Sequence, residues 1–216
     1  MAWTTPRTWS VNELVSAANM NAHVRDNLSY LYDQSMGLML GSRTTLGGAA
    51  ATLGVTGLDT TWEILFFRAH LRGAAVATSD TVRLRLGGAS LDTTAANYYG
   101  YNDNVAGTGP TRSVQENLGA TAGIFTGTYI PAASATASYF ADIWGWIQNG
   151  NKSAEYKTGM FWNKYQLANT TGNVALQWGQ GYWLNVANTL QQISFITASG
   201  SNIAAGSWLS VYGGNA

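Results

Sequence analysis

Hydrophobic and polar residues change their spacing along this chain. From residue 17 to residue 34, apolar side chains recur at three- and four-residue steps, which predicts an amphipathic helix with one narrow apolar stripe. Ser16 is a suitable N-cap for this helix, and Gly37 is a suitable stop. After Leu58 the period changes to two, as in β-strands. We therefore expect a helical N-terminal part followed by a long β region.

Proline and glycine mark the boundaries of these parts. Pro6 biases Thr5 toward an extended backbone, so the residues before the helix are expected to form an extended leader. Residues 37–57 are rich in glycine and are expected to form a bridge with at most one short strand. The predicted parts are a leader and helix at 1–36, a glycine-rich bridge at 37–57, and a β domain at 58–216.

The β region alternates most clearly in the segment DTVRLRLGG. There Val82, Leu84 and Leu86 are predicted on one face of a strand, and Arg83 and Arg85 on the other, solvated or interfacial face. The segment TWEILFFRAHLRG is mostly apolar, so we expect a strand buried on both faces. About eight short strands without an intervening helical run predict a mainly β fold, an antiparallel β-sandwich of jelly-roll type.

The composition limits the partners of this protein. Charged residues make up only 10% of the chain, against the roughly 25% of ordinary soluble domains. Either the β faces carry neutral polar residues, or much of the surface is covered by contacts between subunits. The 11 basic and 11 acidic residues cancel, so nucleic acid is not an expected partner. No secretory signal pattern and no apolar run of membrane-spanning length occurs, so membrane insertion is not expected.

Catalytic and metal-binding signatures are missing from the sequence. The two histidines, His23 and His70, lack partners at metal-ligand spacing and are expected to be structural. No cysteine, nucleophile elbow or phosphate-binding loop occurs, so we predict no enzymatic activity, no cofactor and no metal. The stretch from Asn102 to Asn104 offers oxygen donors of the kind that calcium uses, but without calcium-loop spacing we expect a plain turn.

Acidic residues leave one catalytic alternative open. Glycoside hydrolysis needs two carboxylates at a fixed separation, and folding could bring two of them together. The acidic residues that could form such a catalytic pair are Asp80, Asp92, Asp103, Glu116, Asp142 and Glu155.

Aromatic residues are numerous, with 9 Trp and 11 Tyr. Trp144 and Trp146 share one face of a predicted strand and are expected in the core or in a subunit interface. Tyr98, Tyr99 and Tyr101 lie in the loop-like segment NYYGYNDN, where we expect exposure. Since aromatic rings stack on the apolar faces of pyranoses, these three tyrosines are the candidates for receptor binding.

The opening segment WTTPRTWSVNELVSAANMNAHVRDNLSYL resembles the start of small virion proteins of tailed bacteriophages. The matching residues are Pro6, Arg7, Thr8, Trp9, Glu13, Val15, Ser16, Ala17, Asn21, His23, Arg25, Asp26 and Asn27. Asn12 stands where glycine is common in that group, and Ser16 where threonine is common. Three later segments also resemble the group: DTVRLRLGG followed by NYYGY, then IWGWIQNGNKSAEYKT, and NIAAGSWLSVYG.

This resemblance implies a protein of the virion, assembled in the host cytoplasm. Tail-fibre, tail-spike and head-fibre proteins are members of the group, and phage fibres are commonly homotrimers. The implied attachment residues, which would contact another virion protein, are Trp3, Pro6, Arg7 and Trp9. The implied trimer seam consists of Met20, Val24, Asn27, Leu28 and Leu31, with Asn27 setting the register.

Three functions follow as expectations. The first is a non-enzymatic attachment protein whose β domain binds host-surface glycan. The second is a capsid-decorating or tail-assembled subunit with no receptor role, and the third is a small glycan-degrading spike.

Overall fold

The computed structural model describes residues 16–25, 39–106, 111–118, 123–166 and 174–214. The chain forms two compact units, residues 1–40 and residues 41–216. Each unit is described by itself below.

The N-terminal unit contains a short helix. The α-helix α1, Ala17–Met20, continues directly into the π-helical turn η1, Asn21–Arg25. The N-cap prediction is confirmed, because the Ser16 side chain accepts a hydrogen bond of 3.2 Å from the backbone N–H of Asn19. The expected helix over 17–34 is described only as far as Arg25.

The predicted contact residues of this unit fall into two groups. Met20 and Val24 are exposed in the single chain, at 45% and 38% of their full surface. The other seam and attachment residues lie outside the described residues: Trp3, Pro6, Arg7, Trp9, Asn27, Leu28 and Leu31.

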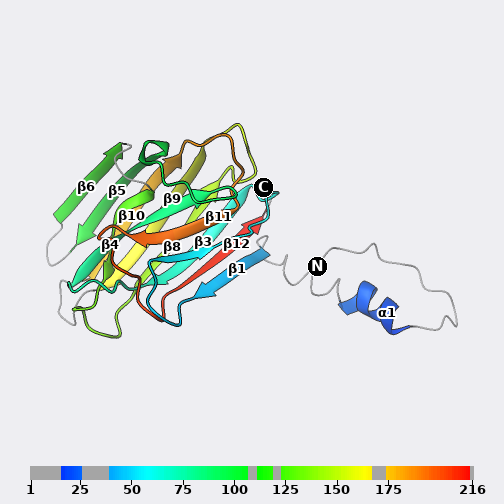
Figure 1. The fold of residues 1–216 in the computed structure, drawn as a ribbon, viewed down its shortest axis with the longest axis horizontal. Helices are drawn as coiled ribbons and strands as arrows, with labels where there is room; N and C mark the ends of the chain where they lie inside the picture. The colour runs from blue at the N-terminus through cyan, green and yellow to red at the C-terminus, as the bar shows by residue number, and fades with distance from the viewer. Residues whose placement is uncertain (1–15, 26–38, 107–110, 119–122, 167–173, 215–216) are drawn as a thin grey trace. The chain divides into compact units, whose positions relative to one another are not determined.

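The described residues of the second unit form two antiparallel sheets (Figure 1). The larger sheet has eight strands in the order β1-β12-β3-β8-β9-β10-β5-β6, and the smaller has four in the order β2-β11-β4-β7. The strands are β1 Met39–Thr45, β2 Thr52–Val55, β3 Ile64–Leu71, β4 Ser79–Gly87, β5 Tyr98–Ala106, β6 Thr111–Leu118, β7 Ile124–Pro131, β8 Ala141–Gln148, β9 Lys157–Gln166, β10 Val174–Trp183, β11 Gln192–Thr197 and β12 Trp208–Gly214. A 3₁₀ turn, η2 Ala95–Asn97, precedes β5. The predicted mainly β, antiparallel architecture is confirmed.

The core lies between the two sheets. Alternate residues of β3, Leu65, Phe67 and Leu71 among them, are fully buried. The ring of Phe67 meets that of Phe195 from β11 edge-on, with centroids 6.0 Å apart. This contact joins the inner faces of the two sheets, as in other β-sandwiches.

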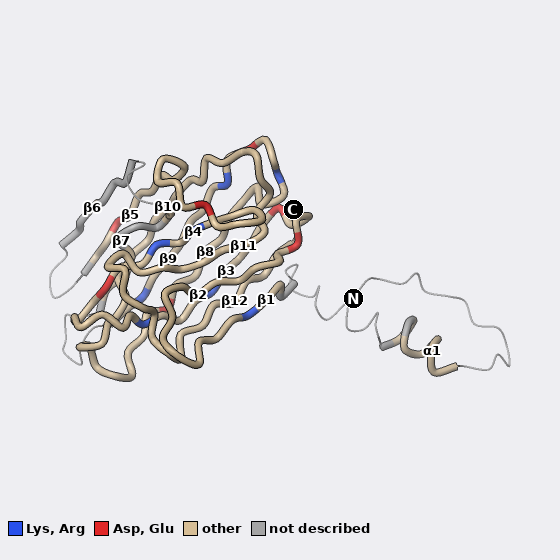
Figure 2. Tube along the Cα trace, viewed as in Figure 1, with Lys and Arg blue, Asp and Glu red and all other residues tan. Residues whose placement is uncertain are grey.

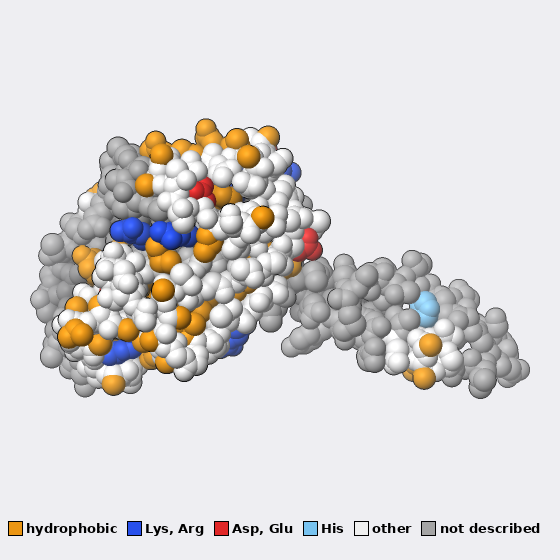
Figure 3. Space-filling model, viewed as in Figure 1, with side chains coloured by type: hydrophobic (Ala, Val, Ile, Leu, Met, Phe, Trp, Pro, Cys, Tyr) orange, Lys and Arg blue, Asp and Glu red, His pale blue; other side chains and the backbone are white. Residues whose placement is uncertain are grey.

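Strand β4 follows the predicted alternation. Val82, Leu84 and Leu86 are fully buried, while Arg83 and Arg85 are half-buried on the outer face of the small sheet. The residues directly opposite the two arginines on β11 are the neutral Ile196 and Ser194. Figure 3 views this side of the unit, where a few basic side chains lie among neutral and hydrophobic ones. Figure 2 shows how sparsely charged residues are spread over both sheets.

Two predictions about these strands are wrong. The expected glycine-rich bridge contains β1 and β2, which belong to the large and the small sheet. Leu53 and Val55 of β2 are buried because β2 pairs with β11, so this segment is part of the sandwich. Strand β3 is buried on its inner face only, since Phe66 and His70 are half-buried and Arg68 is exposed on its outer face.

Candidate binding face on the eight-stranded sheet

At the middle of β10, glycines face inward and large aromatic residues face outward. In β10, Gly179 and Gly181 face the core, while Trp178 and Tyr182 face out. A Cβ at Gly179 would lie 2.4 Å from both the Phe161 ring and the Tyr101 carbonyl oxygen. The inner glycine therefore leaves room for Phe161 in the core, while Trp178 and Tyr182 remain on the outer face.

Three tryptophans cross the outer face side by side. Trp144, Trp162 and Trp178 stand directly opposite one another on β8, β9 and β10, and we call them the tryptophan row. The Trp144 and Trp162 rings are stacked with centroids 6.5 Å apart. Trp146 packs against Trp162 from the neighbouring position, at 4.9 Å. These side chains lie outside the sandwich core, so the core alternative predicted for Trp144 and Trp146 is wrong, and an interface or a binding face remains as their role; Ile143, on the opposite face of β8, is buried in the core.

A hollow lined by tyrosines adjoins the tryptophan row. Tyr99 and Tyr101 of β5, Tyr182 of β10, and Tyr156 from the loop before β9 surround a volume of about 560 Å³, and we call these four residues the tyrosine trough. Tyr99 and Tyr182 are a direct cross-strand pair, and Tyr101 stands opposite Gln180. Two further hollows of about 250 and 600 Å³ share Tyr182 as a wall, so its ring stands at the centre of a longer depression.

The structure changes the list of candidate tyrosines. The segment NYYGYNDN is the beginning of a strand and not a loop, and its alternation points Tyr99 and Tyr101 outward. Tyr98 points inward and is only 1% exposed, so its proposed exposure is wrong. Sequence reasoning missed Tyr156 and Tyr182; the alternation of large and glycine residues in QWGQGYW was the available signal for Tyr182.

Lys157 holds the loop that carries Tyr156. Its fully buried Nζ donates hydrogen bonds to the carbonyls of Lys152 at 2.6 Å, Glu155 at 3.2 Å and Asn185 at 3.4 Å. It also lies 5.4 Å from the ring centre of Trp183. Burial lowers the pKa of Lys157. One side chain thus ties the loop before β9 to the segment after β10.

Asp92 fixes the base of β5 and the end of β10. Its carboxylate accepts hydrogen bonds from the Trp183 indole at 2.8 Å, from the Asn97 amide at 2.7 Å and from the Thr94 backbone N–H at 2.8 Å. Burial alone would raise the pKa of Asp92, but these hydrogen bonds outweigh it and hold the pKa below the usual value.

A second aromatic cluster lies at the β12 side of the same face. The His70 ring stacks between Phe140 and Trp208, at centroid distances of 4.4 and 5.8 Å, and its Nδ1 lies 2.9 Å from Asp142 Oδ1. The guanidinium of Arg43 lies 4.6 Å from the Trp208 ring centre. His70, expected from the sequence to be structural, is thus a strand residue held by two rings and a carboxylate.

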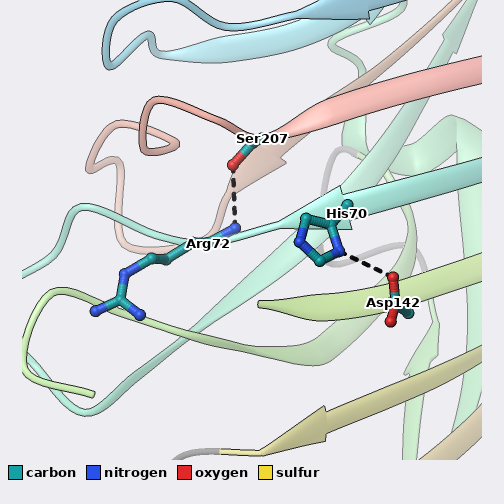
Figure 4. Close-up of polar contacts among 4 residues, drawn as sticks. All are labelled: His70, Arg72, Asp142 and Ser207. Carbon is teal, nitrogen blue, oxygen red and sulfur yellow. Dashed lines mark hydrogen bonds and ion pairs between the residues drawn. The ribbon is translucent and has the colours of Figure 1, made fainter. Parts of the chain in front are cut away.

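Serine, histidine and aspartate occur near one another here without forming a catalytic relay. Ser207 is fully buried, and its hydroxyl accepts a hydrogen bond of 3.1 Å from the backbone N–H of Arg72. Figure 4 shows the His70 imidazole turned toward Asp142 and Ser207 bonded to Arg72. The Ser207 hydroxyl therefore binds the backbone of Arg72 and has no access to solvent.

The acidic residues and histidines form no cluster suited to a metal in the described part of the chain. No group of three or more His, Asp or Glu side chains that could hold a metal occurs there. Asn102, Asp103 and Asn104 lie within β5, so the expected turn is wrong. Asp80 accepts hydrogen bonds from the Thr81 backbone N–H and the Ser199 hydroxyl, a local structural role.

Comparisons with known proteins give no family assignment. No protein-family model matches the chain, and neither a curated protein nor a solved structure matches it. Among the described residues, no helix combines the length and apolarity needed to cross a membrane. The outer aromatic face is the main feature on which a function can be argued.

Proposed function

We propose that this chain is a structural protein of a bacteriophage virion that attaches to the particle by its N-terminal segment and binds host-surface glycan with its β-sandwich. The observation that carries the proposal is the outer face of the large sheet, where Tyr99, Tyr156, Tyr182 and Trp178 are exposed at 37, 52, 41 and 38%. Exposed aromatic residues gathered on one face are typical of interaction sites. The resemblance of the opening segment to phage proteins supports the virion context.

Attachment and glycan binding are assigned to different units of the chain. The attachment residues, Trp3, Pro6, Arg7 and Trp9, belong to the unit that ends at residue 40, and the aromatic face belongs to the unit that begins at residue 41. Separate units allow one end to be fixed to the particle while the other meets the host. As a homotrimer, the protein would present three copies of one weak site, and several weak contacts together give useful adhesion.

Deletion of residues 1–36 tests the attachment. The cut lies before every strand that the structure describes, since β1 begins at Met39. We expect the shortened protein to keep its β circular-dichroism spectrum and to be absent from purified particles. Full-length protein with both Trp3 and Trp9 changed to Ala should show the same defect. Incorporation of the shortened protein at the normal level would refute the attachment role.

A purely structural subunit, on the capsid or in the tail, is the second candidate. The tryptophan row favours it, because a row of partly exposed indoles on one sheet face is well suited to packing against another subunit. Electron microscopy of particles separates the two candidates. An outer face covered by neighbouring subunits supports the structural role, and a face open to solvent supports glycan binding.

A further inference from the structure

We infer that the tyrosine trough binds a neutral oligosaccharide, with Tyr182 as the central stacking platform and Gln180 as a hydrogen-bonding partner. The inference rests on the proposed glycan-binding function and gives it a site, a ligand class and a charge preference. Four observations support it, concerning the rings, the polar groups, the absence of charge and the rigidity of the site.

The rings are arranged as platforms. Tyr99 and Tyr182 stand opposite each other on neighbouring strands, and Tyr156 approaches from the loop before β9. Each of the three is more than one-third exposed, so ring surface is open to a ligand. The hollow of about 560 Å³ falls within the range of small-molecule sites. A pyranose presents C–H groups on its faces, and these pack on an aromatic ring.

Neutral polar groups accompany the rings. Gln180 lines both the trough and the adjoining hollow, where Gln148 and Thr158 are its neighbours. The Thr158 hydroxyl lies 3.4 Å from Gln148 Oε1. A side-chain amide both donates and accepts hydrogen bonds. It can therefore pair with neighbouring hydroxyl groups of a sugar ring, which also donate and accept. The combination of aromatic platform and amide rim suits a saccharide better than a purely apolar ligand.

Among the described residues, the lining carries no positive charge that would attract an acidic sugar. The described residues around the trough are four tyrosines with Gly100, Gln180 and Leu184, all neutral. The hollow on the other side of Tyr182 includes Glu155 as its one charged residue. A carboxylate or sulfate group on the ligand would meet no cation among these described lining residues and would be repelled by Glu155. A neutral saccharide is therefore preferred over an anionic one.

The site is fixed before a ligand arrives. Asn149 has a left-handed backbone, with φ of 62°, and its side-chain amide donates a hydrogen bond of 3.1 Å to the Tyr156 carbonyl. Lys157 binds two carbonyls of the same loop and one of the segment after β10, and the Asp92 network anchors β5 and β10. Rigid placement lowers the entropic cost of binding.

The test titrates full-length protein with cellohexaose, maltohexaose and chitohexaose, and with polygalacturonic acid as the anionic comparison, by calorimetry. We expect at least one neutral hexasaccharide to bind more tightly than the anionic polymer. Tyr182→Ala should weaken that binding at least about tenfold, whereas Tyr182→Phe should keep it within about threefold because the ring remains. Tyr212→Ala, the same change on β12 across the sheet, is the matched control and should leave binding unchanged.

Three results would overturn the inference. The first is binding of none of the neutral hexasaccharides, and the second is binding that Tyr182→Ala leaves intact. The third is an oligomer of the wild-type protein that Tyr182→Ala dissociates, because a second copy would then occupy the trough. Incorporation into particles tests the virion role separately from saccharide binding. If Tyr182→Ala protein enters particles normally but no saccharide binds, the virion role is still supported and only the saccharide site is refuted.

Discussion

At the scale of single residues, Tyr98 links three parts of the chain beneath the candidate site. Its hydroxyl accepts a hydrogen bond of 3.1 Å from the Leu86 backbone N–H and lies within 3.0 Å of the carbonyl oxygens of Leu86 and Asp92. It is the side chain directly before Tyr99, so its fixed position determines where the first tyrosine of the trough points. A buried hydroxyl with these partners stabilises the fold by holding backbone groups that water cannot reach.

Burial, together with the nearby negative charge of Asp92, raises the pKa of Tyr98. In the unfolded chain the phenol loses its proton near pH 10, while the folded protein keeps it. The stability from this group is therefore fully present below about pH 10 and is lost as the pH rises further. We expect the urea midpoint of the wild-type protein to fall above about pH 10, as followed by circular dichroism.

Tyr98→Phe is the comparison for this pH dependence. At neutral pH it should cost about 1–3 kcal/mol, because the Leu86 backbone N–H loses its partner in the interior. Above about pH 10 its loss of stability should be shallower than that of the wild-type protein. Burial also raises the pKa of Tyr165, but this residue is present in both proteins and adds the same pH dependence to each. Parallel curves for the two proteins would show that Tyr98 does not carry the effect.

At the scale of the strand, β10 depends on glycine where a core strand usually has a bulky side chain. We predict that Gly179→Ala destabilises the sandwich by about 1–3 kcal/mol or more, since the new methyl group would meet the Phe161 ring and a backbone oxygen at 2.4 Å. Thermal unfolding measures the loss.

Gly47→Ala provides the control for this substitution. No atom lies within 4 Å of the position that its Cβ would take, so its effect should stay within about 0.5 kcal/mol. Equal unfolding temperatures for the two variants would mean that the core rearranges around the methyl group, and that inner glycine does not determine the outward position of the large residues.

Local alternation predicted some strands well and others not at all. Val82, Leu84 and Leu86 could be placed correctly because the period of two is unbroken there, and burial follows directly from it. Strand β2 was missed because glycine interrupts its alternation. Its burial comes from pairing with β11, which is distant in the sequence and leaves no local signal.

The candidate site was predictable only in part, for the same reason. Tyr99 and Tyr101 could be selected from their own segment. Tyr182 joins them through the register of β10 against β5, and Tyr156 through the loop that Lys157 holds. Such contacts depend on the completed fold, so the sequence identified Tyr99 and Tyr101 but not Tyr156 and Tyr182.

At the scale of the whole molecule, few charges and exposed apolar side chains occur together. Charged residues are 10% of the chain, and both units expose large apolar residues. Met20 and Val24, four residues apart, are the large exposed apolar side chains in the described part of the N-terminal helix. A helix of this length has little stability alone, so burial of these side chains against other copies is the expected source of its order.

We predict that the full-length protein is a trimer held by this seam, with a sedimentation mass of three chains. Each side chain buried at the seam should contribute about 1.5–3 kcal/mol, so changing both Met20 and Val24 to Asp should give monomers with an intact β spectrum. Val76→Asp adds one carboxylate at a position that is 96% exposed and should leave the trimer unchanged. A wild-type monomer would contradict the prediction. A trimer that persists after both seam residues are changed to Asp would also contradict it. In that case, dissociation of the trimer by Trp178→Asp would place the subunit contact on the tryptophan row.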